Sequence, residues 1–100
     1  MKLPKTIRVG SRRYKVEVTE QMPRRSTMAE VNYRDRTITL ATHSNVTGRS
    51  FKTEVIDDSF WHELTHAILH EMGRTRLRND EQFVSEFASL LTKAINSAKF

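Results

Sequence analysis

The sequence contains no cysteine. This absence excludes disulfide bonds, thiol nucleophiles and thiolate metal sites, so any metal ion must be held by histidine and carboxylate side chains. No apolar run approaches the roughly 20 residues that a transmembrane helix needs. Residues 1–6 are basic but are followed by neither an apolar stretch nor a small-residue cleavage site, which argues against a signal peptide. We therefore expect a cytoplasmic protein without a membrane segment.

Length and composition are typical of one soluble domain. A chain of 100 residues can bury a modest core of its own, and a second domain is not expected. Hydrophobic residues make up 37% and charged residues 29%, a balance found in globular proteins rather than in disordered chains. We expect residues 1–100 to form a single domain.

The chain is basic, with 17 lysines and arginines against 12 acidic residues and a net charge of +5. Such a charge favours weak attraction to nucleic acids or acidic partners. The basic residues are scattered, however, and aromatic residues are not interleaved with them. Their clusters fall in three predicted loops, at Arg12-Arg13, Arg24-Arg25 and Arg74, Arg76 and Arg78. Because solvated loops explain such clusters, nucleic acid is not an expected partner and a nucleic-acid-binding module is the least favoured function.

The first half of the chain reads as strands. Apolar and polar residues alternate over residues 6–9 and 14–18, around Gly10, and again over 29–33 and 37–41. This spacing predicts two hairpins and a small antiparallel sheet of about four strands. Residues 42–50 are polar and should link the sheet to the second half of the chain.

The second half, residues 51–100, reads as helices. Residues 51–72 contain no proline or glycine, are apolar on most of the helical circumference, and are followed by Gly73 as a C-terminal cap. Residues 74–78 are predicted as a basic loop. Asn79, with Gln82 three residues later, suits the start of a second helix that continues to about residue 97. Strands followed by helices predict an α+β fold with a sheet part, 1–50, and a helical part, 51–100.

One motif carries chemistry, the His-Glu-x-x-His sequence formed by His62, Glu63 and His66. Four residues turn an α-helix by about 400°, so the two imidazoles point the same way and can bind one metal ion. Glu63 lies about 100° from His62, where it can stand beside the metal as a general base. The alternative is that both histidines are partly buried helix residues hydrogen-bonded to the sheet. In either case His70 is expected to be a helix C-terminal histidine favoured by the macrodipole, and His43 a linker residue.

A third ligand should come from the second helix, and Glu81 is the preferred candidate over Glu86 and Asp80. Glu81 lies at the edge of the face formed by Val84, Ala88 and Ile95, which should pack on the first helix. Glu86 is about 140° away on the helical wheel, so only one of the two can face the metal. The plain alternative for Asp80 and Glu81 is first-turn charge that stabilises the helix dipole.

Two segments, 60–69 and 81–91, resemble the ImmA/IrrE-type zinc peptidases, especially the minimal versions found in bacteriophage and prophage genomes. They read FWHELTHAIL and EQFVSEFASLL. In that family a glutamate on the second helix is the third metal ligand, and Glu81, Ser85, Phe87 and Ala88 fall in step with its pattern. The resemblance implies a zincin-like fold, bound Zn²⁺, and a cytoplasmic protease or regulator that acts on repressor-type proteins.

The sequence thus predicts a zinc metallopeptidase with His62, His66 and Glu81 as ligands and Glu63 as the base. Its substrate would be a protein or peptide, added as an extended strand along an exposed edge formed by residues 37–41. The second hypothesis is a non-catalytic zinc-binding regulator or protein-interaction module of the same fold. The sequence assigns neither the substrate nor an oligomeric state.

Overall fold

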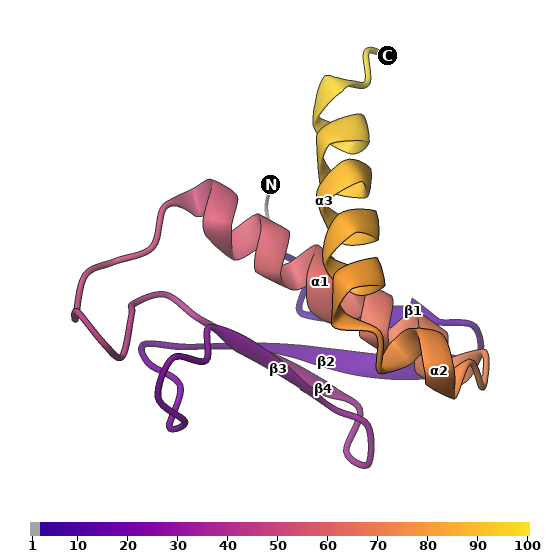
Figure 1. Ribbon diagram of the computed structural model, residues 1–100, viewed down its shortest axis with the longest axis horizontal. Helices are drawn as coiled ribbons and strands as arrows, with labels where there is room; N and C mark the ends of the chain where they lie inside the picture. Colours follow the sequence, from indigo (N-terminus) through magenta and orange to yellow (C-terminus); the bar gives the residue numbers. More distant parts are fainter. Residues whose placement is uncertain (1–2) are drawn as a thin grey trace.

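The computed structural model describes residues 3–100 as four strands followed by three helices (Figure 1). The strands are β1 (Thr6–Val9), β2 (Arg12–Thr19), β3 (Ala29–Asn32) and β4 (Thr37–Ala41). The helices are α1 (Thr53–Glu71), the short α2 (Thr75–Arg78) and α3 (Glu81–Ser97). The predicted α+β class is confirmed, and all strands precede the helices along the chain.

The sheet is mixed, and the prediction of a purely antiparallel sheet is wrong. Its strand order is β1-β2-β4-β3. The hairpins β1–β2 and β3–β4 are antiparallel as predicted, but β2 and β4 pair in parallel, with Val16 opposite Ile38 and Val18 opposite Leu40. The loop over residues 20–28 carries the chain past the position of β4, so that β3 becomes the outer strand.

Burial explains this order. Strand β4 alternates threonine with large apolar residues, and Ile38, Leu40 and Ala41 are all buried. Strand β3 carries the exposed Glu30, which an edge strand tolerates better than a central one. The expectation that residues 37–41 form an exposed edge is therefore wrong, because β4 is paired on both sides and the edge strands are β1 and β3.

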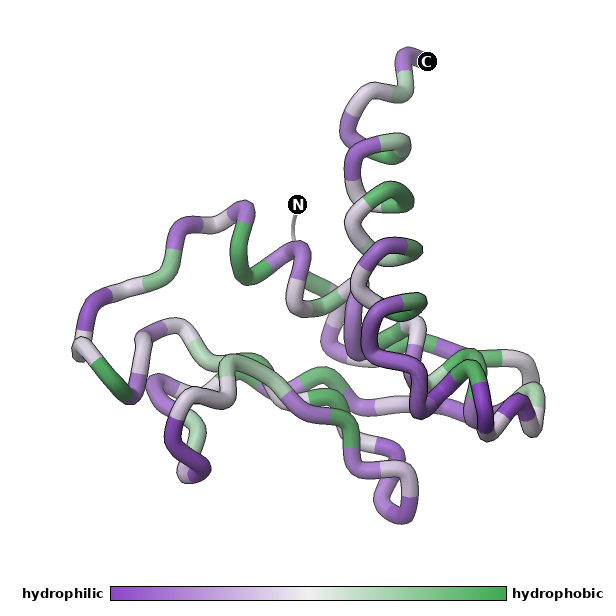
Figure 2. Tube along the Cα trace, in the orientation of Figure 1, coloured by the Kyte–Doolittle hydropathy of each residue, from purple (hydrophilic) through white to green (hydrophobic). Residues whose placement is uncertain are grey.

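Helix α1 crosses one face of the sheet and closes the core against it (Figure 1). In Figure 2 the apolar segments of α1 and of the sheet lie opposite one another. The buried core consists of Val9, Tyr14, Ile38, Leu40, Phe60, Leu64 and Ala67. Helix α1 ends at Glu71, and Gly73 follows as the predicted capping glycine: its φ is +73°, Gly73 N–H donates to the His70 carbonyl, and Arg74 N–H donates to the Leu69 carbonyl.

The connection to α3 differs from the prediction in two details. Residues 74–78 are not a plain loop, because Thr75–Arg78 form one helical turn. The N-cap of α3 is Asp80 rather than Asn79, and its carboxylate accepts a hydrogen bond from Phe83 N–H at 3.1 Å. Gln82, expected in a capping box, instead donates to Glu86 at 3.2 Å. A carboxylate cap also suits the positive end of the helix dipole.

Helix α3 runs away from the sheet, and its last turns extend beyond the rest of the molecule (Figure 1). Its buried residues are Val84, Ala88 and Thr92, while Phe87, Leu90 and Ile95 are exposed. The predicted packing face is thus correct at Val84 and Ala88 but not at Ile95. None of the helices within residues 3–100 combines the length and apolar composition that crossing a membrane requires.

Candidate metal centre

Three side chains from two helices converge at one point. His62 and His66 lie one turn apart on α1, and Glu81 is the first residue of α3. The His66 Nε2 atom is 2.8 Å from Glu81 Oε1, and His62 Nε2 is 3.2 Å from Glu81 Oε2. One donor atom from each residue lies within 4.8 Å of the others. The structure therefore brings together the three residues that the sequence predicts as metal ligands.

The approach of Glu81 to the histidines depends on the end of α1. The Gly73 cap reverses the chain, the single turn of α2 follows, and Asp80 starts α3 beside α1. Burial of Val84 and Ala88 then fixes the side of α3 that faces α1. Asp80 is engaged as the helix cap, and Glu86 is exposed and accepts a hydrogen bond from Gln82, so neither joins the cluster.

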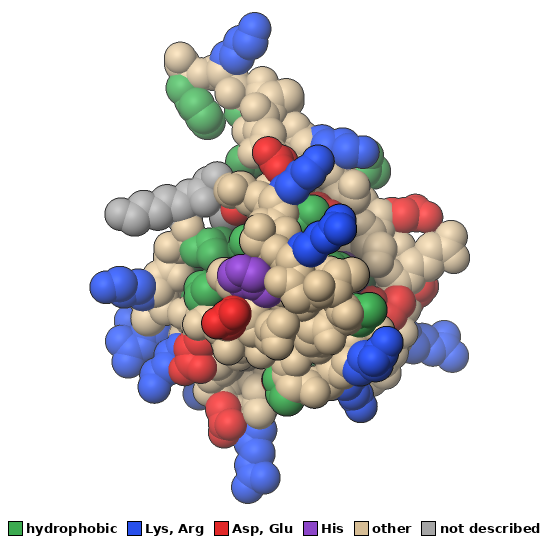
Figure 3. All heavy atoms as spheres, turned by 90° about the vertical axis from the view of Figure 1, so that its left-hand side faces the viewer, with side chains coloured by type: hydrophobic (Ala, Val, Ile, Leu, Met, Phe, Trp, Pro, Cys, Tyr) green, Lys and Arg blue, Asp and Glu red, His purple; other side chains and the backbone are tan. Residues whose placement is uncertain are grey.

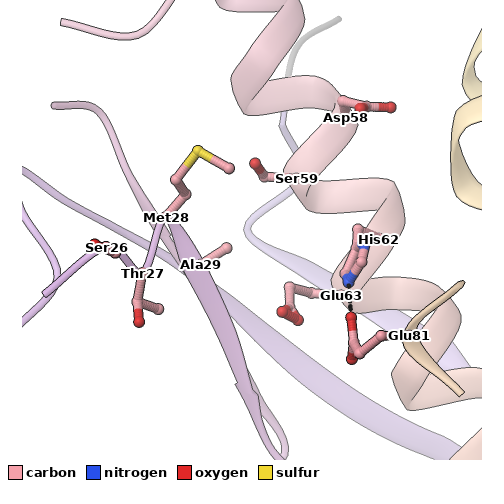
Figure 4. A pocket seen from close by; sticks show the side chains of 9 residues that line it. All are labelled: Ser26, Thr27, Met28, Ala29, Asp58, Ser59, His62, Glu63 and Glu81. Atoms are coloured by element: carbon pink, nitrogen blue, oxygen red, sulfur yellow. Dashed lines mark hydrogen bonds and ion pairs between the residues drawn. The ribbon is translucent and has the colours of Figure 1, made fainter. Parts of the chain in front are cut away.

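Glu63 is buried next to this cluster, with an exposed fraction of 8%. Figure 4 shows its carboxylate between β3 and the His62–Glu81 pair. Its Oε2 atom is buried and has no hydrogen-bond partner within the described residues. Burial, reinforced by the nearby Glu81 and Glu30 carboxylates, raises the pKa of Glu63 to about 7. A carboxyl group with this pKa can both accept and return a proton near neutral pH.

The surroundings of His66 favour the uncharged ring, which is the charge state that metal binding needs. Burial lowers the pKa of His66, and the neighbouring His62 lowers it further, while Glu81 opposes both. Its Nδ1 atom is buried and forms no hydrogen bond within residues 3–100, although the Arg78 backbone is near enough to favour the protonated ring. A neutral imidazole with Nε2 directed at the cluster is the form in which histidine binds metals.

The donor set fits a small divalent cation. Two imidazole nitrogens and one carboxylate are the protein ligands of many open zinc sites, which leave a fourth position for water or substrate. Ligand bonds near 2.0–2.1 Å in a tetrahedral site place donor atoms about 3.3 Å apart, so the three donor atoms, which lie within 4.8 Å of one another, would draw closer together around the ion. The buried Oε2 atom of Glu63, which has no hydrogen-bond partner among the described residues, is a second indication of a metal site, because a nearby cation would compensate the charge of this carboxylate.

Two hollows meet at this centre. One, of about 320 Å³, is lined by His62, Glu63 and Glu81 together with residues 26–29, 58 and 59 (Figure 4). The other, of about 410 Å³, shares Glu63 and Glu81 but also reaches His66, Tyr33 and Arg78. Both border β3, whose outer edge has no strand partner in the part of the chain that the structure describes. A peptide lying along this edge would pass the centre.

Tyr33, His70 and Arg78 lie beside the site although no sequence pattern connects them with it. The Tyr33 ring stacks on His70 with centroids 4.4 Å apart, and the Arg78 guanidinium carbon lies 4.8 Å from the Tyr33 centroid. Three separate elements supply them, so no local pattern could have revealed the group. His43 lies elsewhere, in an isolated bridge with Ser50.

Comparison of the chain with protein-family models, with curated proteins and with solved structures gave no match.

Proposed function

We propose that the protein is a zinc-dependent metallopeptidase, zincin-like in fold and similar to the ImmA/IrrE-type peptidases. The proposal rests on one observation, the convergence of His62, His66 and Glu81 beside the buried carboxylate of Glu63. His62, His66 and Glu81 would hold the metal. When bound, Zn²⁺ supplies Lewis acidity that makes water a stronger nucleophile at neutral pH and polarises a carbonyl group.

Glu63 would move the proton. Its carboxylate accepts a proton from the attacking water as the oxygen adds to the peptide carbonyl carbon. It then returns that proton to the amine nitrogen as the C–N bond breaks, so the residue ends each cycle in its starting state. Its position on α1, one residue after His62, keeps it in contact with the hollow in which a scissile bond would lie.

Strand β3 would align the substrate. An extended peptide can add to an unpaired sheet edge through main-chain hydrogen bonds, which are independent of side-chain identity. Ala29 of β3 and Glu63 line both hollows, so a peptide on the edge would lie between the strand and the active-site helix. A cytoplasmic, repressor-type protein is the partner suggested by the family resemblance.

The second candidate function is a non-catalytic regulator that binds metal and a protein partner through the same face. The modest size of the hollows favours it, since about 320 and 410 Å³ lie at the lower end of the range for binding pockets. In this case the metal would stabilise the fold, and Glu63 would have no chemical role.

The deciding experiment is cleavage of a peptide library by protein that has been stripped of metal and reloaded with one equivalent of Zn²⁺. We expect cleavage that is lost in Glu63→Gln, because the amide is nearly isosteric but cannot accept the proton. Zinc content measured by elemental analysis should be the same in both proteins. Equal cleavage by both would remove Glu63 as the base, and absence of cleavage with full zinc content would favour the regulator.

A further inference from the structure

The larger hollow begins at the candidate metal centre and ends at a guanidinium group. Glu63, His66 and Glu81 line one part of it, and Tyr33 and Arg78 line another. A peptide bound with its scissile bond at Glu63 would therefore place a neighbouring group of the peptide within reach of Arg78. Val31 of β3 also lines the hollow, which therefore borders the edge strand.

The guanidinium of Arg78 is held in place by three contacts. One terminal nitrogen lies 2.7 Å from His70 Nδ1, and the group packs on the face of the Tyr33 ring. Its Nε is 3.5 Å from the side-chain oxygen of the neighbouring Asn79. Since arginine is always protonated, the short contact requires His70 to accept with an unprotonated Nδ1. A group fixed in this way loses little freedom when it binds a ligand.

Within residues 3–100, Arg78 has no carboxylate partner. Arg36 is the contrasting case, because its Nε pairs with Glu71 at 3.2 Å. The second terminal nitrogen of Arg78 donates to no described residue, so the planar group retains free N–H donors. Arginine presents such donors as a fork that matches the two oxygens of a carboxylate.

The charges around the hollow are compatible with an acidic ligand. Arg24 lines it as a second cation, facing the carboxylates of Glu30, Glu63 and Glu81. The Glu81 side chain is 67% exposed, so its charge is screened by solvent. Glu30 is exposed and therefore well screened by solvent.

We propose that Arg78, fixed by Tyr33 and His70, is the specificity-determining residue of a subsite for a peptide carboxylate. The carboxylate would come either from an acidic side chain next to the scissile bond or from the C-terminus of the peptide. The identification of the ligand as a peptide rests on the proposed peptidase function. The recognition of a carboxylate rests only on the contacts of Arg78.

The test measures binding rather than cleavage, on the full chain in the presence of a chelator so that no metal can bind the carboxylate. Three acetylated alanine-rich hexapeptides serve as probes. The first has a central glutamate and an amidated end, the second has only a free C-terminal carboxylate, and the third has neither. Binding is followed by NMR chemical-shift titration. We expect at least one carboxylate probe to bind about tenfold more tightly than the neutral peptide, and the first two probes identify which carboxylate is recognised.

Arg78→Gln should abolish this preference, whereas Arg76→Gln, an equal loss of charge at an exposed position of the same short helix, should retain it. Arg78→Lys keeps the positive charge but lacks the two parallel N–H donors of the guanidinium, and should reduce the preference for the carboxylate probes several-fold. This variant replaces Arg78→Gln in the test if Arg78→Gln does not fold. Equal affinity for all three probes, or the same loss in Arg76→Gln as in Arg78→Gln, would overturn the proposal. If the protein fails to cleave peptides with zinc but still prefers the carboxylate probes, the peptidase proposal fails and the carboxylate subsite stands. If it cleaves peptides but shows no carboxylate preference, only the subsite proposal fails.

Discussion

Glu81 contacts both histidines through different oxygens, which makes it the residue on which the candidate metal centre depends. We expect Glu81→Ala to weaken zinc binding by at least about tenfold, because removal of a direct donor should cost no less than the loss of an outer partner. Competition with a chromogenic chelator measures the affinity. Glu86→Ala is the matched control and should bind zinc normally, since Glu86 is exposed and lies outside the cluster. The reverse result would assign the third ligand to Glu86.

Glu63 should weaken the metal-free protein at alkaline pH. Its pKa is raised by burial to about 7, so its neutral form is favoured by folding. The stability of the folded protein is therefore highest below the pKa that Glu63 has in the unfolded chain, near 4.3. It falls as the pH rises toward and through about 7, where the folded protein must hold the charged carboxylate. In the presence of a chelator we therefore expect Glu63→Gln to be more stable than the parent by about 1–2 kcal/mol at pH 8, with a smaller difference at pH 5. Urea unfolding at the two pH values measures this.

Glu86→Gln is the control for Glu63→Gln, because an exposed carboxylate should give no pH-dependent difference. An equal effect of Glu63→Gln at pH 5 and pH 8 would show that burial of the charge is not the cause. A residue that lowers the stability of the metal-free fold at a candidate centre fits the pattern expected where activity and stability conflict.

His62, Glu63 and His66 could be selected from the sequence because helical spacing is a local property. Selecting Glu81 required an argument about tertiary packing, since its position depends on where α3 begins and on which face of α3 packs on α1. The predicted N-cap was Asn79, one residue before the actual cap Asp80. This error did not change the predicted orientation of Glu81 toward α1, which follows from the face of α3 that packs on α1. Arg78 could not be selected, because its place beside Tyr33 is defined only once three elements have been assembled.

At the scale of elements, Tyr14 joins the sheet to the end of α1. Tyr14 is fully buried on β2, and its hydroxyl donates to Glu71 Oε2, in the last turn of α1, at 2.5 Å. Arg36, in the β3–β4 turn, donates to the same oxygen at 3.2 Å. The pKa of Glu71 is lowered, first by the bond from Tyr14 and then by that from Arg36, with burial opposing both.

Tyr14→Phe should therefore destabilise the protein by about 1–2 kcal/mol at pH 7, the usual cost of losing a hydrogen bond to a charged group. A lowered carboxyl pKa gives stability that is present above the unfolded value near 4.3 and is lost as the pH falls through the folded value. The destabilisation should thus shrink below pH 4, and thermal unfolding from pH 3 to pH 7 measures it. In a Glu71→Gln background the effect of Tyr14→Phe should no longer depend on pH in this range. A pH-dependent effect there would contradict the assignment.

The strands themselves were predictable from alternation, but their order in the sheet was not. Alternation reports which residues of a strand share a face and says nothing about which strand lies beside it. Two hairpins can be placed side by side in several ways, and the choice made here buries Ile38 and Leu40 between β2 and β3. This tertiary preference also moves the free edge from β4 to β3, and with it the expected place of a bound peptide.

At the scale of the whole molecule, the face shown in Figure 3 does not gather its positive charge into a single surface. On the face shown in Figure 3, lysine and arginine side chains are dispersed, with acidic side chains between them. A nucleic-acid-binding surface concentrates basic residues along one face or groove. The net charge of +5 is therefore better explained by solvated side chains than by a polyanion site on this face.

The candidate centre also connects a helix that is buried against the sheet with a helix that projects away from it. His62 and His66 belong to α1, which is buried against the sheet, whereas Glu81 begins α3, which projects away from it and buries only Val84, Ala88 and Thr92 (Figure 1). A metal bound by all three residues would link the helices at the start of α3. Because a ligand that binds only the native state stabilises that state, the link should reduce local opening of α3 more than that of the sheet.

Zinc should therefore slow amide hydrogen exchange most strongly in α3. We expect exchange of the amides in residues 84–92 to slow by about tenfold or more on addition of one equivalent of Zn²⁺, while amides of β4 change less, since their exchange already requires opening of the core. Hydrogen exchange followed by NMR measures both sets in one experiment. Glu81→Ala should remove the protection of α3 even at zinc concentrations that saturate the two histidines, because the connection between the helices is then missing. Equal protection of α3 in the parent and in this variant would show that the metal is held by α1 alone.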